Sequence, residues 1–425
     1  MPKETQSPAQ SLAFDPADPR AALSQLPASP AVFALYAAEA HAEPYIGRTP
    51  NLRSRLERLL QPSPKHPRRL QLAGRVRRIE YRLTGSEFES LLAQFSLLEE
   101  VYGAKALERM HLRAPAFVRY LGDNPYPRVV VTHRPSLREA DWAYGPFPSR
   151  AAAERYVDEA LKLFLLRRCT DDLHPDPSHP GCVYSEMKMC LAPCYKGCTD
   201  ERYAQESIAV EAFLATRGES RLVQLRTQRD EASANLEFEA AAALHAQVQR
   251  IECVRALAPE LVRPLSRLRA VVLQASAQPD EVAVFLYADG RLTGPAAFST
   301  LGMRIQNEQS GSSSLFAHPV AMEAIPESQP PEATAAPEAP ARTARGVLES
   351  RMEAALAALA TCHPAPSSTI RQGHMALLKR WYYRPEARRP GEIFFPDAEG
   401  HWPVKALLRG AGRVAARALV PPRAE

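Results

Sequence analysis

The sequence predicts a multidomain α+β protein. We expect a small mixed sheet with helices at the N-terminus, a cysteine-bound connector, a helical hairpin, and a C-terminal β-rich piece with a disordered linker. Three observations lead to this fold class. Short apolar runs alternate with amphipathic stretches in the first hundred residues, five of the seven cysteines lie within residues 169–198, and a tract rich in Ser, Pro, Glu and Ala covers residues 306–345.

Length and composition allow two to four domains in the 425 residues, and the 39 prolines indicate many breaks and linkers. No apolar run approaches the ~18 residues that would span a bilayer, so we expect a soluble cytoplasmic protein without a membrane partner. The expected divisions are 1–25 (disordered leader), 26–105 (N-terminal domain), 106–168 (connector), 169–198 (cysteine block), 200–256 (hairpin), 257–305 (β-rich segment), 306–345 (flexible linker) and 346–425 (C-terminal helical segment).

Local signals predict the elements of the N-terminal domain. Asp18 followed by Pro19 is a good start for a short helix, and Asn51 is a good N-cap for a basic helix that ends at Leu60. Apolar residues 31–38 and residues 44–47 predict two short strands, a third strand follows at residues 79–84, and a helix starts near Ser86.

Basic residues are concentrated at residues 48–78, where ten Lys or Arg accompany one acid, Glu57. Such a run is either a solvated face or a phosphate-binding surface, and composition alone does not separate the two. If the run binds phosphate, the candidate nucleic-acid-binding residues are Arg48, Arg53, Arg58 and Lys65.

The cysteine block predicts a metal or cluster site. Cys169, Cys182, Cys190 and Cys194 are followed by Cys198, and a loop rich in Pro, His and Asp separates the first two. Disulfides fit poorly because the N-terminus does not resemble a signal peptide and cytosolic thiols stay reduced. By ligand count, zinc and an iron–sulfur cluster fit equally well.

The connector and hairpin also carry local signals. Residues 126–132 predict a strand, and residues 144–149 predict a turn before a helix that starts at Ser149 and runs into Cys169. Amphipathic helices are expected over residues 200–217 and, as a pair, over residues 222–251, with Asn235 capping the second member of that pair.

The C-terminal third begins with two expected strands, residues 268–274 and 281–287, and Asp289-Gly290 predicts a hairpin turn into a third. A helix is expected at residues 347–362. We interpret Asp397, Glu399 and His401 as an exposed turn because they are neighbours in one loop.

The order of the cysteines, Cys-x12-Cys-x7-Cys-x3-Cys with Pro193 before the last, resembles the cysteine block of the UvrC family, the nuclease subunit of bacterial nucleotide excision repair. The resemblance implies that Cys169, Cys182, Cys190 and Cys194 hold a [4Fe-4S] cluster, with Zn2+ as the alternative. It also implies a GIY-YIG nuclease domain before the block and a UvrB-binding hairpin after it.

Both flanks carry that resemblance. Tyr45-Ile46-Gly47 is similar to the YIG motif, Ala31-Val32-Phe33 stands at the first motif, and Arg55 matches the helix arginine. Residues 236–241, LEFEAA, resemble the UVR motif that docks on UvrB, which implies a UvrB-like helicase partner. The implied partner-binding residues are Leu236, Phe238, Glu239 and Ala242.

The departures from the family pattern fall on the chemistry. The metal-binding glutamate aligns with Gln94, and the first-motif tyrosine aligns with Phe33. Losing metal stabilisation forfeits several kcal/mol of transition-state binding, and each ~1.4 kcal/mol is tenfold in rate. We therefore expect a UvrC-like protein that binds DNA and UvrB but has lost incision at Tyr45 and Arg55. Residues 375–396 resemble the segment leading into a ribonuclease H-like domain, which we expect to be absent.

Two alternatives stay open. The first is an active endonuclease that uses Mg2+ or Mn2+, with Glu89, Glu99 or Glu100 as the metal ligand if the helix register differs by a few residues. The second is a metal- or cluster-stabilised interaction protein that does not act on DNA. Nicking assays with Gln94→Glu address the first alternative, and the salt dependence of DNA binding addresses the second.

Overall fold

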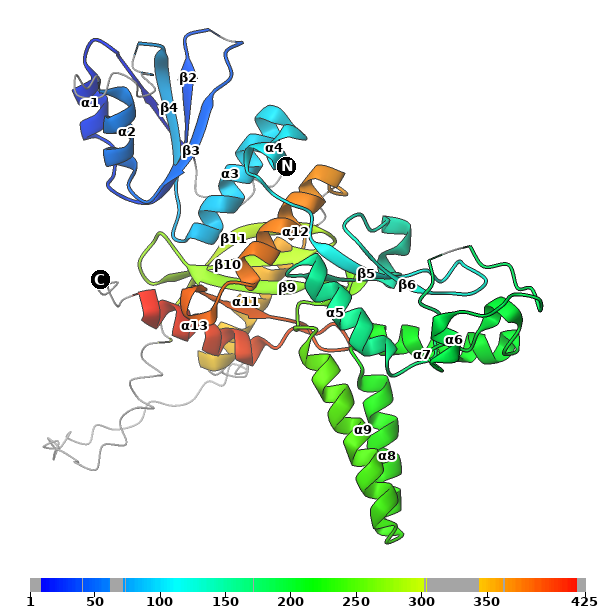
Figure 1. Cartoon of the computed structure of the whole chain (residues 1–425). Helices are drawn as coiled ribbons and strands as arrows, with labels where there is room; N and C mark the ends of the chain where they lie inside the picture. Colours follow the sequence, from blue (N-terminus) through cyan, green and yellow to red (C-terminus); the bar gives the residue numbers. More distant parts are fainter. Residues whose placement is uncertain are drawn as a thin grey trace, which may run out of the picture.

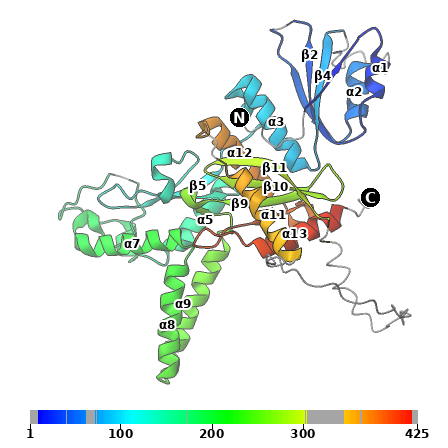
Figure 2. The same ribbon diagram turned by 180° about the vertical axis from the view of Figure 1, so that it is seen from behind.

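The computed structural model describes residues 9–39, 41–61, 72, 74–170, 172–301, 303, 344–361 and 364–418. Three small sheets, each with four strands in the described parts of the chain, organise the molecule. In Figure 1 an N-terminal sheet lies at one end, a C-terminal sheet with helices on both faces is central, and a helical hairpin projects from the opposite side. Figure 2 shows the same arrangement from behind.

The N-terminal sheet has the strand order β1-β4-β2-β3, and all its pairs are antiparallel. The expectation of a mixed sheet is therefore wrong, because β3 returns beside β2 as a hairpin and β4 joins the other side of β2 in the opposite direction. The elements are β1 (Gln10–Ala13), α1 (Pro19–Ser24), β2 (Ala31–Ala37), β3 (Tyr45–Thr49), α2 (Leu52–Leu60) and β4 (Val76–Leu83).

Local capping signals in this unit are confirmed. The Asp18 side chain accepts the N–H of Ala21, and Asn51 accepts that of Ser54, so each satisfies an otherwise unpaired helix donor. The expectation of a disordered leader over residues 1–25 is wrong where the structure describes it. β1 pairs with β4, and Phe14 and Leu23 are buried beneath the sheet's helices, so apolar burial orders this segment.

Helix α3 (Glu87–Tyr102), followed by α4 (Lys105–Arg109), turns its apolar side away from the N-terminal sheet. Phe88 packs edge-on against Phe285 of the C-terminal sheet, and Phe95 lies in the same core. A cleft lined by Glu80 and Arg82 on the sheet side and by Ala93 on the helix side lies between α3 and the N-terminal sheet. Helix α3 thus joins the N-terminal sheet to the rest of the molecule.

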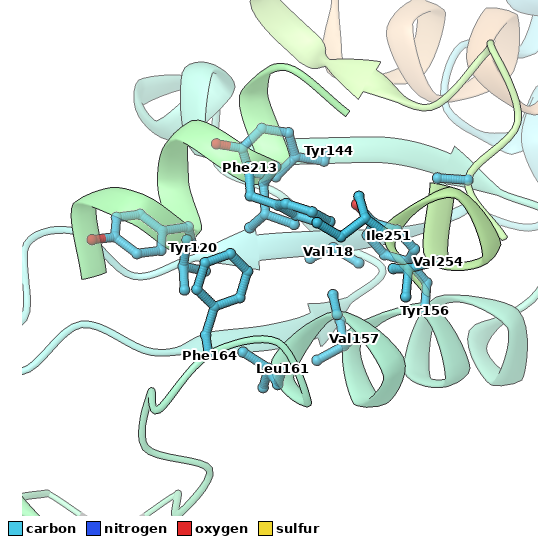
Figure 3. Packing of buried hydrophobic residues seen from close by; sticks show 14 of the residues in the cluster. Val118, Tyr120, Tyr144, Tyr156, Val157, Leu161, Phe164, Phe213, Ile251 and Val254 are labelled. Carbon is cyan, nitrogen blue, oxygen red and sulfur yellow. The ribbon is translucent and has the colours of Figure 1, made fainter. Parts of the chain in front are cut away.

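The second sheet has the order β6-β5-β7-β8 and packs against helices α5 and α7. Figure 3 shows aromatic and branched side chains from the strands and from α5, α7 and α9 meeting in one core. The elements are β5 (Ala116–Tyr120), β6 (Val129–Thr132), a 3-10 helix (Leu137–Trp142), β7 (Ala143–Phe147), α5 (Arg150–Leu161), α6 (Val183–Glu186), a 3-10 turn (Pro193–Tyr195), α7 (Asp200–Ala215) and β8 (Arg263–Pro264).

Two connector predictions need correction. Residues 143–147 form strand β7 because they pair with β5 and β8, whereas the sequence predicted a turn at residues 144–149. The helix capped by Ser149 ends at Leu161, so it does not run into Cys169, and Leu166 then reaches the core in extended chain.

The hairpin consists of α8 (Glu219–Ala234) and α9 (Phe238–Ala256). Asn235 does not cap the second helix: it is the C-cap of α8, and the left-handed Leu236 (φ 61°) and Glu237 complete the turn. Leu222, Leu225, Val248 and Ile251 are buried near the base, where α7 and α5 cover them. The tip lies far from the three sheets (Figure 1).

The C-terminal sheet has the order β11-β10-β9-β12 and lies between two helical layers. Helices α3 and α12 cover one face, and α11 and α13 cover the other. The elements are a 3-10 turn (Leu265–Arg267), β9 (Ala270–Ala275), β10 (Glu281–Ala288), β11 (Arg291–Ser299), α11 (Ala344–Leu359), α12 (Ser368–Tyr382), a 3-10 turn (Glu386–Arg388), β12 (Glu392–Phe394) and α13 (Val404–Ala418).

The expected strands and the Asp289-Gly290 turn are confirmed, with φ angles of 52° and 79° at the two turn residues. The β-rich segment and the later helical segment, which the sequence analysis treated as separate pieces, share one sheet because β12 pairs with β9. Most of the expected linker at residues 306–345 lies outside the described residues. None of the described helices is long and apolar enough to cross a membrane.

Candidate functional site

Tyr45 and Arg55 come together at the face of the N-terminal sheet that α2 covers. Strand β3 carries Tyr45, and α2 places Arg55 one turn beyond its N-cap. The Arg55 Nη2 donates to the Tyr45 hydroxyl at 3.4 Å. A guanidinium beside a phenol can hold a phosphate and stabilise negative charge on it.

Phe33 lies beside this pair but offers no polar atom. Its side chain is 1% exposed, and its ring centre is 6.1 Å from that of Tyr45. A Cβ at Gly47 would lie 2.8 Å from Phe33 Cζ, so the glycine lets the ring pack flat against β3. At this position the site has a buried apolar ring and no hydroxyl group.

Two contacts identify the face of α3 that lies along β3. Near the start of the helix, Glu87 pairs with Arg48 at 3.6 Å, and near its end the Tyr102 hydroxyl donates to the Pro44 carbonyl at 2.8 Å. Gln94 follows Glu87 by seven residues, about two helical turns, so it lies on the same face between these contacts. It is half-buried there.

Glu89 points elsewhere. Its side chain is buried among α3, β4 and the C-terminal sheet, and it accepts the N–H of Gly85 at 2.8 Å. Burial raises the pKa of Glu89, and the Gly85 hydrogen bond and the Arg82 charge oppose that rise. A buried carboxylate that is bonded to the backbone just before its own helix is poorly placed to hold a metal beside Tyr45.

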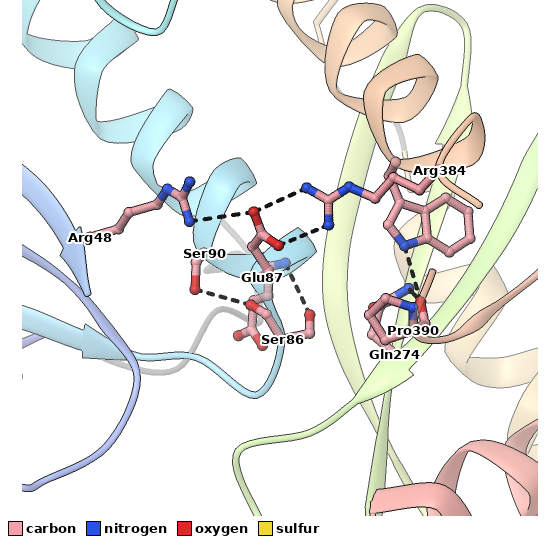
Figure 4. A network of polar contacts seen from close by, with 9 residues as sticks. Arg48, Ser86, Glu87, Ser90, Gln274, Arg384 and Pro390 are labelled. Atoms are coloured by element: carbon pink, nitrogen blue, oxygen red, sulfur yellow. Dashed lines mark hydrogen bonds and ion pairs between the residues drawn. The ribbon is translucent and has the colours of Figure 1, made fainter. Parts of the chain in front are cut away.

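The predicted DNA-binding arginines have different surroundings. Arg58 is exposed and its Nε donates to the Ser54 carbonyl, whereas Arg53 donates to the carbonyls of Leu26 and Ser24 and so ties α2 to α1. Arg48 is held by Glu87, which also binds Arg384 (Figure 4). Lys65 lies outside the described residues.

The five cysteines of the block are all half-buried free thiols. The N–H of Leu191 bonds to the Leu165 carbonyl and that of Asp176 to the Cys194 carbonyl, so the loop folds back on itself. Lys188, Ala192 and Lys196 have left-handed backbone (φ 55°, 56° and 59°), which is uncommon outside glycine. Sharp turns at these three positions order the loop between Met187 and Cys198.

Four of the thiols are close enough for the charge of one to affect the pKa of another. Burial raises the pKa of Cys190 to about 11, and the Ala192 N–H, 3.3 Å from its sulfur, opposes the rise. Negative charge on neighbouring thiols adds to the rise, and these neighbours are Cys169, Cys182 and Cys194. An Arg167 Nη1 lies 3.7 Å from the Cys169 sulfur, so a positive charge borders the group.

The spread of these sulfurs bears on what they could hold. We considered the Cys, His, Asp and Glu side chains in the described part of the chain as possible metal ligands. Among them, only Asp397, Glu399 and His401 bring three ligand atoms within 4.8 Å of one another. No three of the block's sulfur atoms meet that criterion, and this does not choose between zinc and a cluster. Asp397, Glu399 and His401 are exposed, and Asp397 accepts backbone N–H groups of its own loop.

Cys198 differs from the other four. Burial raises its pKa, followed by the charge of Asp200, whereas the charge of Arg202 lowers it. It packs at the edge of the second core beside Tyr126. The charges that act on the Cys198 thiol therefore come from the start of α7.

The hairpin tip presents the predicted partner-binding residues to solvent. Leu236 and Phe238 are 72% and 66% exposed, and Glu239 and Ala242 are exposed beside them. Two large apolar side chains that lie this close together and this exposed form a small apolar patch at the end of the hairpin.

Sequence reasoning missed Arg384, because only the three-dimensional packing of α12 on α3 brings it to Glu87. It also missed Arg167, a 1% exposed arginine two residues before the first cysteine. The pair Arg167-Arg168 after the mostly apolar residues 160–166 was the available signal.

Comparisons with known proteins agree with this geometry. Residues 117–213, from β5 to the end of α7 and including the cysteine block, match the family model for the UvrC/Cho excinuclease middle domain. No solved structure matches the chain.

Among curated proteins, the chain is 31% identical to the UvrABC system protein C of Alcanivorax borkumensis over 238 residues, 56% of this chain and 39% of that protein. It is 29% identical to that of Pseudomonas protegens (57% and 39%) and 28% identical to that of Carboxydothermus hydrogenoformans (66% and 46%). The chain thus spans about two fifths of the length of the first relatives it matches. The resemblance to the UvrC type of excinuclease subunit is confirmed, with a UvrC/Cho middle domain at residues 117–213.

Proposed function

We propose that this chain acts in nucleotide excision repair as a UvrC-like protein that binds DNA and a UvrB-like partner, and that its N-terminal nuclease site is degraded. The similarity to UvrABC system protein C supports the repair role. The GIY-YIG likeness of the N-terminal unit supports DNA as the ligand, since Tyr45 and Arg55 lie together on its surface.

One observation carries the loss of incision. Gln94 is on the α3 face that lies along β3, where the family pattern has a metal-binding glutamate. An amide oxygen is a weaker ligand for Mg2+ than a carboxylate, and it leaves the metal charge unneutralised. Phe33 compounds the loss because it places an apolar ring where a phenol would move a proton.

An active endonuclease is the second candidate, and the retained contact between Tyr45 and Arg55 favours it. A plasmid-nicking assay in Mg2+ and in Mn2+ separates the two. The proteins to compare are the parent, Arg55→Ala, Gln94→Glu, Gln94→Glu with Arg55→Ala, and Glu89→Gln.

For the degraded site we expect background nicking by the parent and a measurable rate for Gln94→Glu that Arg55→Ala abolishes. Parent nicking that depends on Arg55 would overturn this proposal in favour of the active enzyme. If that parental activity also requires Glu89, then Glu89 is the metal ligand and the helix register inferred here is wrong.

We propose that Cys169, Cys182, Cys190 and Cys194 hold a [4Fe-4S] cluster with a structural role. The likeness of the cysteine order to the family's block and the Ala192 N–H directed at Cys190 support this choice, because hydrogen bonds to thiolate sulfur are common around such clusters. When bound, the cluster would tie α6 and the loop before α7 to the start of the block.

We propose that the hairpin tip docks on a UvrB-like partner through Leu236 and Phe238. The exposure of both side chains and the likeness of residues 236–241 to the UVR motif support this assignment. An aromatic anchor at the end of a projecting hairpin suits a groove on a partner.

A further inference from the structure

Three arginines from distant parts of the chain meet where the hairpin joins the C-terminal unit. Arg217 lies just after α7 and has left-handed backbone (φ 52°), Arg263 belongs to β8, and Arg389 follows α12. We call them the junction arginines. In Figures 1 and 2 the segment between α12 and α13 passes between the C-terminal sheet and the base of the hairpin.

Each guanidinium is held by backbone carbonyls. Arg217 Nη2 donates to Ala258 O at 3.0 Å, and Arg389 Nη1 donates to Tyr382 O at 2.9 Å. Arg263 donates from Nε to Glu260 O at 3.1 Å and from Nη1 to the Pro396 carbonyl at 3.4 Å. These bonds orient each guanidinium. Because a guanidinium has five N–H donors, each group keeps further donors that these bonds do not use.

Aromatic rings fix two of the groups further. The guanidinium carbon of Arg263 lies 4.6 Å from the ring centre of Phe395, and that of Arg389 lies 5.2 Å from the ring centre of Tyr382. The two rings are 6.5 Å apart. Such stacks lower the entropy lost when an arginine binds a ligand, because the side chain is already ordered.

The positive charges gather around Tyr382, and Glu260 is the carboxylate whose charge acts on both Tyr382 and Arg263. Tyr382 is the shared neighbour: the charges of Arg389 and Arg217 both lower its phenol pKa, against the larger effect of burial. Burial and, after it, the like charge of Arg217 lower the pKa of Arg263, and the charges of Glu260 and Tyr382 oppose them.

The junction arginines differ from other arginines of the chain, which form ion pairs with carboxylates. In the described residues no carboxylate lies within 4.0 Å of any junction arginine, although Arg226 pairs with Glu252 at 2.9 Å and Arg229 with Asp230 at 2.7 Å. Placing like charges together costs free energy, and a bound anion would remove that cost.

The positive surface also continues beyond the junction. Exposed Arg388 lies next to Arg389, and Arg380 and Arg384 at the end of α12 lie near Glu87, which binds Arg48 of the N-terminal sheet. Because Arg48 and Arg384 are paired with Glu87, the exposed positive charge added in this direction comes from Arg380 and Arg388. This extent suits a chain of phosphates better than a single small anion.

We propose that Arg217, Arg263 and Arg389 form a phosphate-binding surface that contacts the backbone of a DNA strand at the base of the hairpin. This inference rests on the proposed function, and it adds a second DNA contact remote from Tyr45 and Arg55. The rings of Phe395 and Tyr382 serve to orient guanidinium groups, so this surface contacts phosphates rather than stacking on bases.

The test measures binding of a fluorescent duplex oligonucleotide by anisotropy as the salt concentration rises. The junction variant is Arg217→Gln with Arg263→Gln and Arg389→Gln. The control variant removes the same charge from carboxylate-paired arginines: Arg226→Gln, Arg229→Gln and Arg413→Gln. Circular dichroism and thermal unfolding check that both variants fold.

We expect the junction variant to bind about tenfold or more weakly at low salt and its log–log salt slope to be shallower by up to about 2.7, about 0.9 for each lost phosphate contact. The control should keep the parental slope. Adding inorganic phosphate at constant ionic strength should not displace the oligonucleotide.

The outcomes separate the two proposals. A parent that does not bind DNA at low salt overturns the proposed function itself. A parent that binds, with a junction variant that keeps the parental slope or a control that loses as much, overturns only the junction surface, and displacement by free phosphate indicates a small-anion site instead. If the triple variant does not fold, Arg389→Gln alone must reduce the slope by about 0.9, or the inference fails.

Discussion

Glu87 and Arg384 lie 297 residues apart and form a bidentate ion pair, with Arg384 Nη1 2.8 Å from Oε2 and Nη2 3.0 Å from Oε1 of the carboxylate (Figure 4). Arg48 contacts the same carboxylate from β3 at 3.6 Å. One acid at the start of α3 therefore connects the N-terminal sheet to the end of α12.

Removing this pair should loosen the attachment of α12 to α3. Because Glu87 is 40% exposed, solvent screening limits the coupling free energy to about 0.5–1 kcal/mol. A double-mutant cycle of Glu87→Gln and Arg384→Gln, read by urea unfolding, measures it. The surface pair Arg150 and Glu154 serves as a matched control with less coupling.

The pair should also respond to pH. The hydrogen bond from Arg384, then the charges of Arg384, Arg48 and Arg380, lower the pKa of Glu87, while burial opposes them. A depressed carboxyl pKa contributes stability above the unfolded value of about 4.3, and that stability is lost as pH falls through the folded value. A coupling free energy that stays constant from pH 7 to pH 2 would contradict this account.

Gly373 of α12 allows the close crossing of α12 and α3. A Cβ there would lie within hard contact of Phe95, so Gly373→Ala must displace that ring and should cost about 1–3 kcal/mol. Gly74→Ala, which meets nothing within 4 Å, should stay within about 0.5 kcal/mol. Phe95→Leu in the Gly373→Ala background should recover part of the loss, and no recovery would mean that the crossing is not the cause.

His374 should make the C-terminal unit sensitive to acid. It is 5% exposed, and its Nδ1 accepts the N–H of Leu292 at 2.9 Å, so the folded unit requires the neutral ring. Burial, and then the charge of Arg291, lower the pKa of His374 to about 3. Since the unfolded pKa is about 6.5, stability is intact above pH 6.5 and falls toward pH 3 by up to about 1.4 kcal/mol per pH unit.

Urea unfolding followed by the fluorescence of buried Trp381 measures that slope. His374→Asn should lower stability at neutral pH, because it leaves a cavity, but it should flatten the dependence between pH 6.5 and pH 4. His401→Asn, at an exposed loop position, should keep the parental slope. A parental stability that does not change over this range would show that His374 is not coupled to folding.

Local signals predicted much of the fold. Asp18, Asn51, Ser86 and Ser149 each cap the helix that their sequence context indicates, because a cap depends only on the next three residues. The same holds for the two-residue turn at Asp289-Gly290. The prediction for Asn235 was wrong because its position fits either the end of α8 or the start of α9. Leu236 has left-handed backbone, which ends α8 at Asn235.

Long-range packing could not be predicted in this way. The apolar side of α3 could cover its own sheet or another, and only the presence of β10 and α12 directs Phe88 and Phe95 to the C-terminal unit. In the candidate site, Tyr45 and Arg55 are ten residues apart and were predictable together. Arg384 was not, because its partner Glu87 is distant in the chain.

The cysteine proposal predicts a difference between neighbouring thiols. Cys190→Ala should abolish bound iron and sulfide and the visible absorption of anaerobically purified protein, because Cys190 lies among the other three thiols. Cys198→Ala should leave both unchanged, since the acid and base beside Cys198 belong to α7. Zinc in place of iron, with no visible absorption, would exclude the cluster.

The hairpin tip offers the most direct test of partner binding. Leu236→Ser and Phe238→Ser change side chains that are 72% and 66% exposed, so unfolding should shift by no more than about 0.5 kcal/mol. A buried interface anchor contributes about 2 kcal/mol or more, so affinity for a UvrB-like protein should fall about thirtyfold or more. Val223→Ser, at a 56% exposed position on the flank of α8, is the matched control and should bind like the parent. If a partner buries Leu236 and Phe238, replacing either one must weaken the complex. Equal affinity of all three variants in a titration would therefore place the partner surface away from the tip.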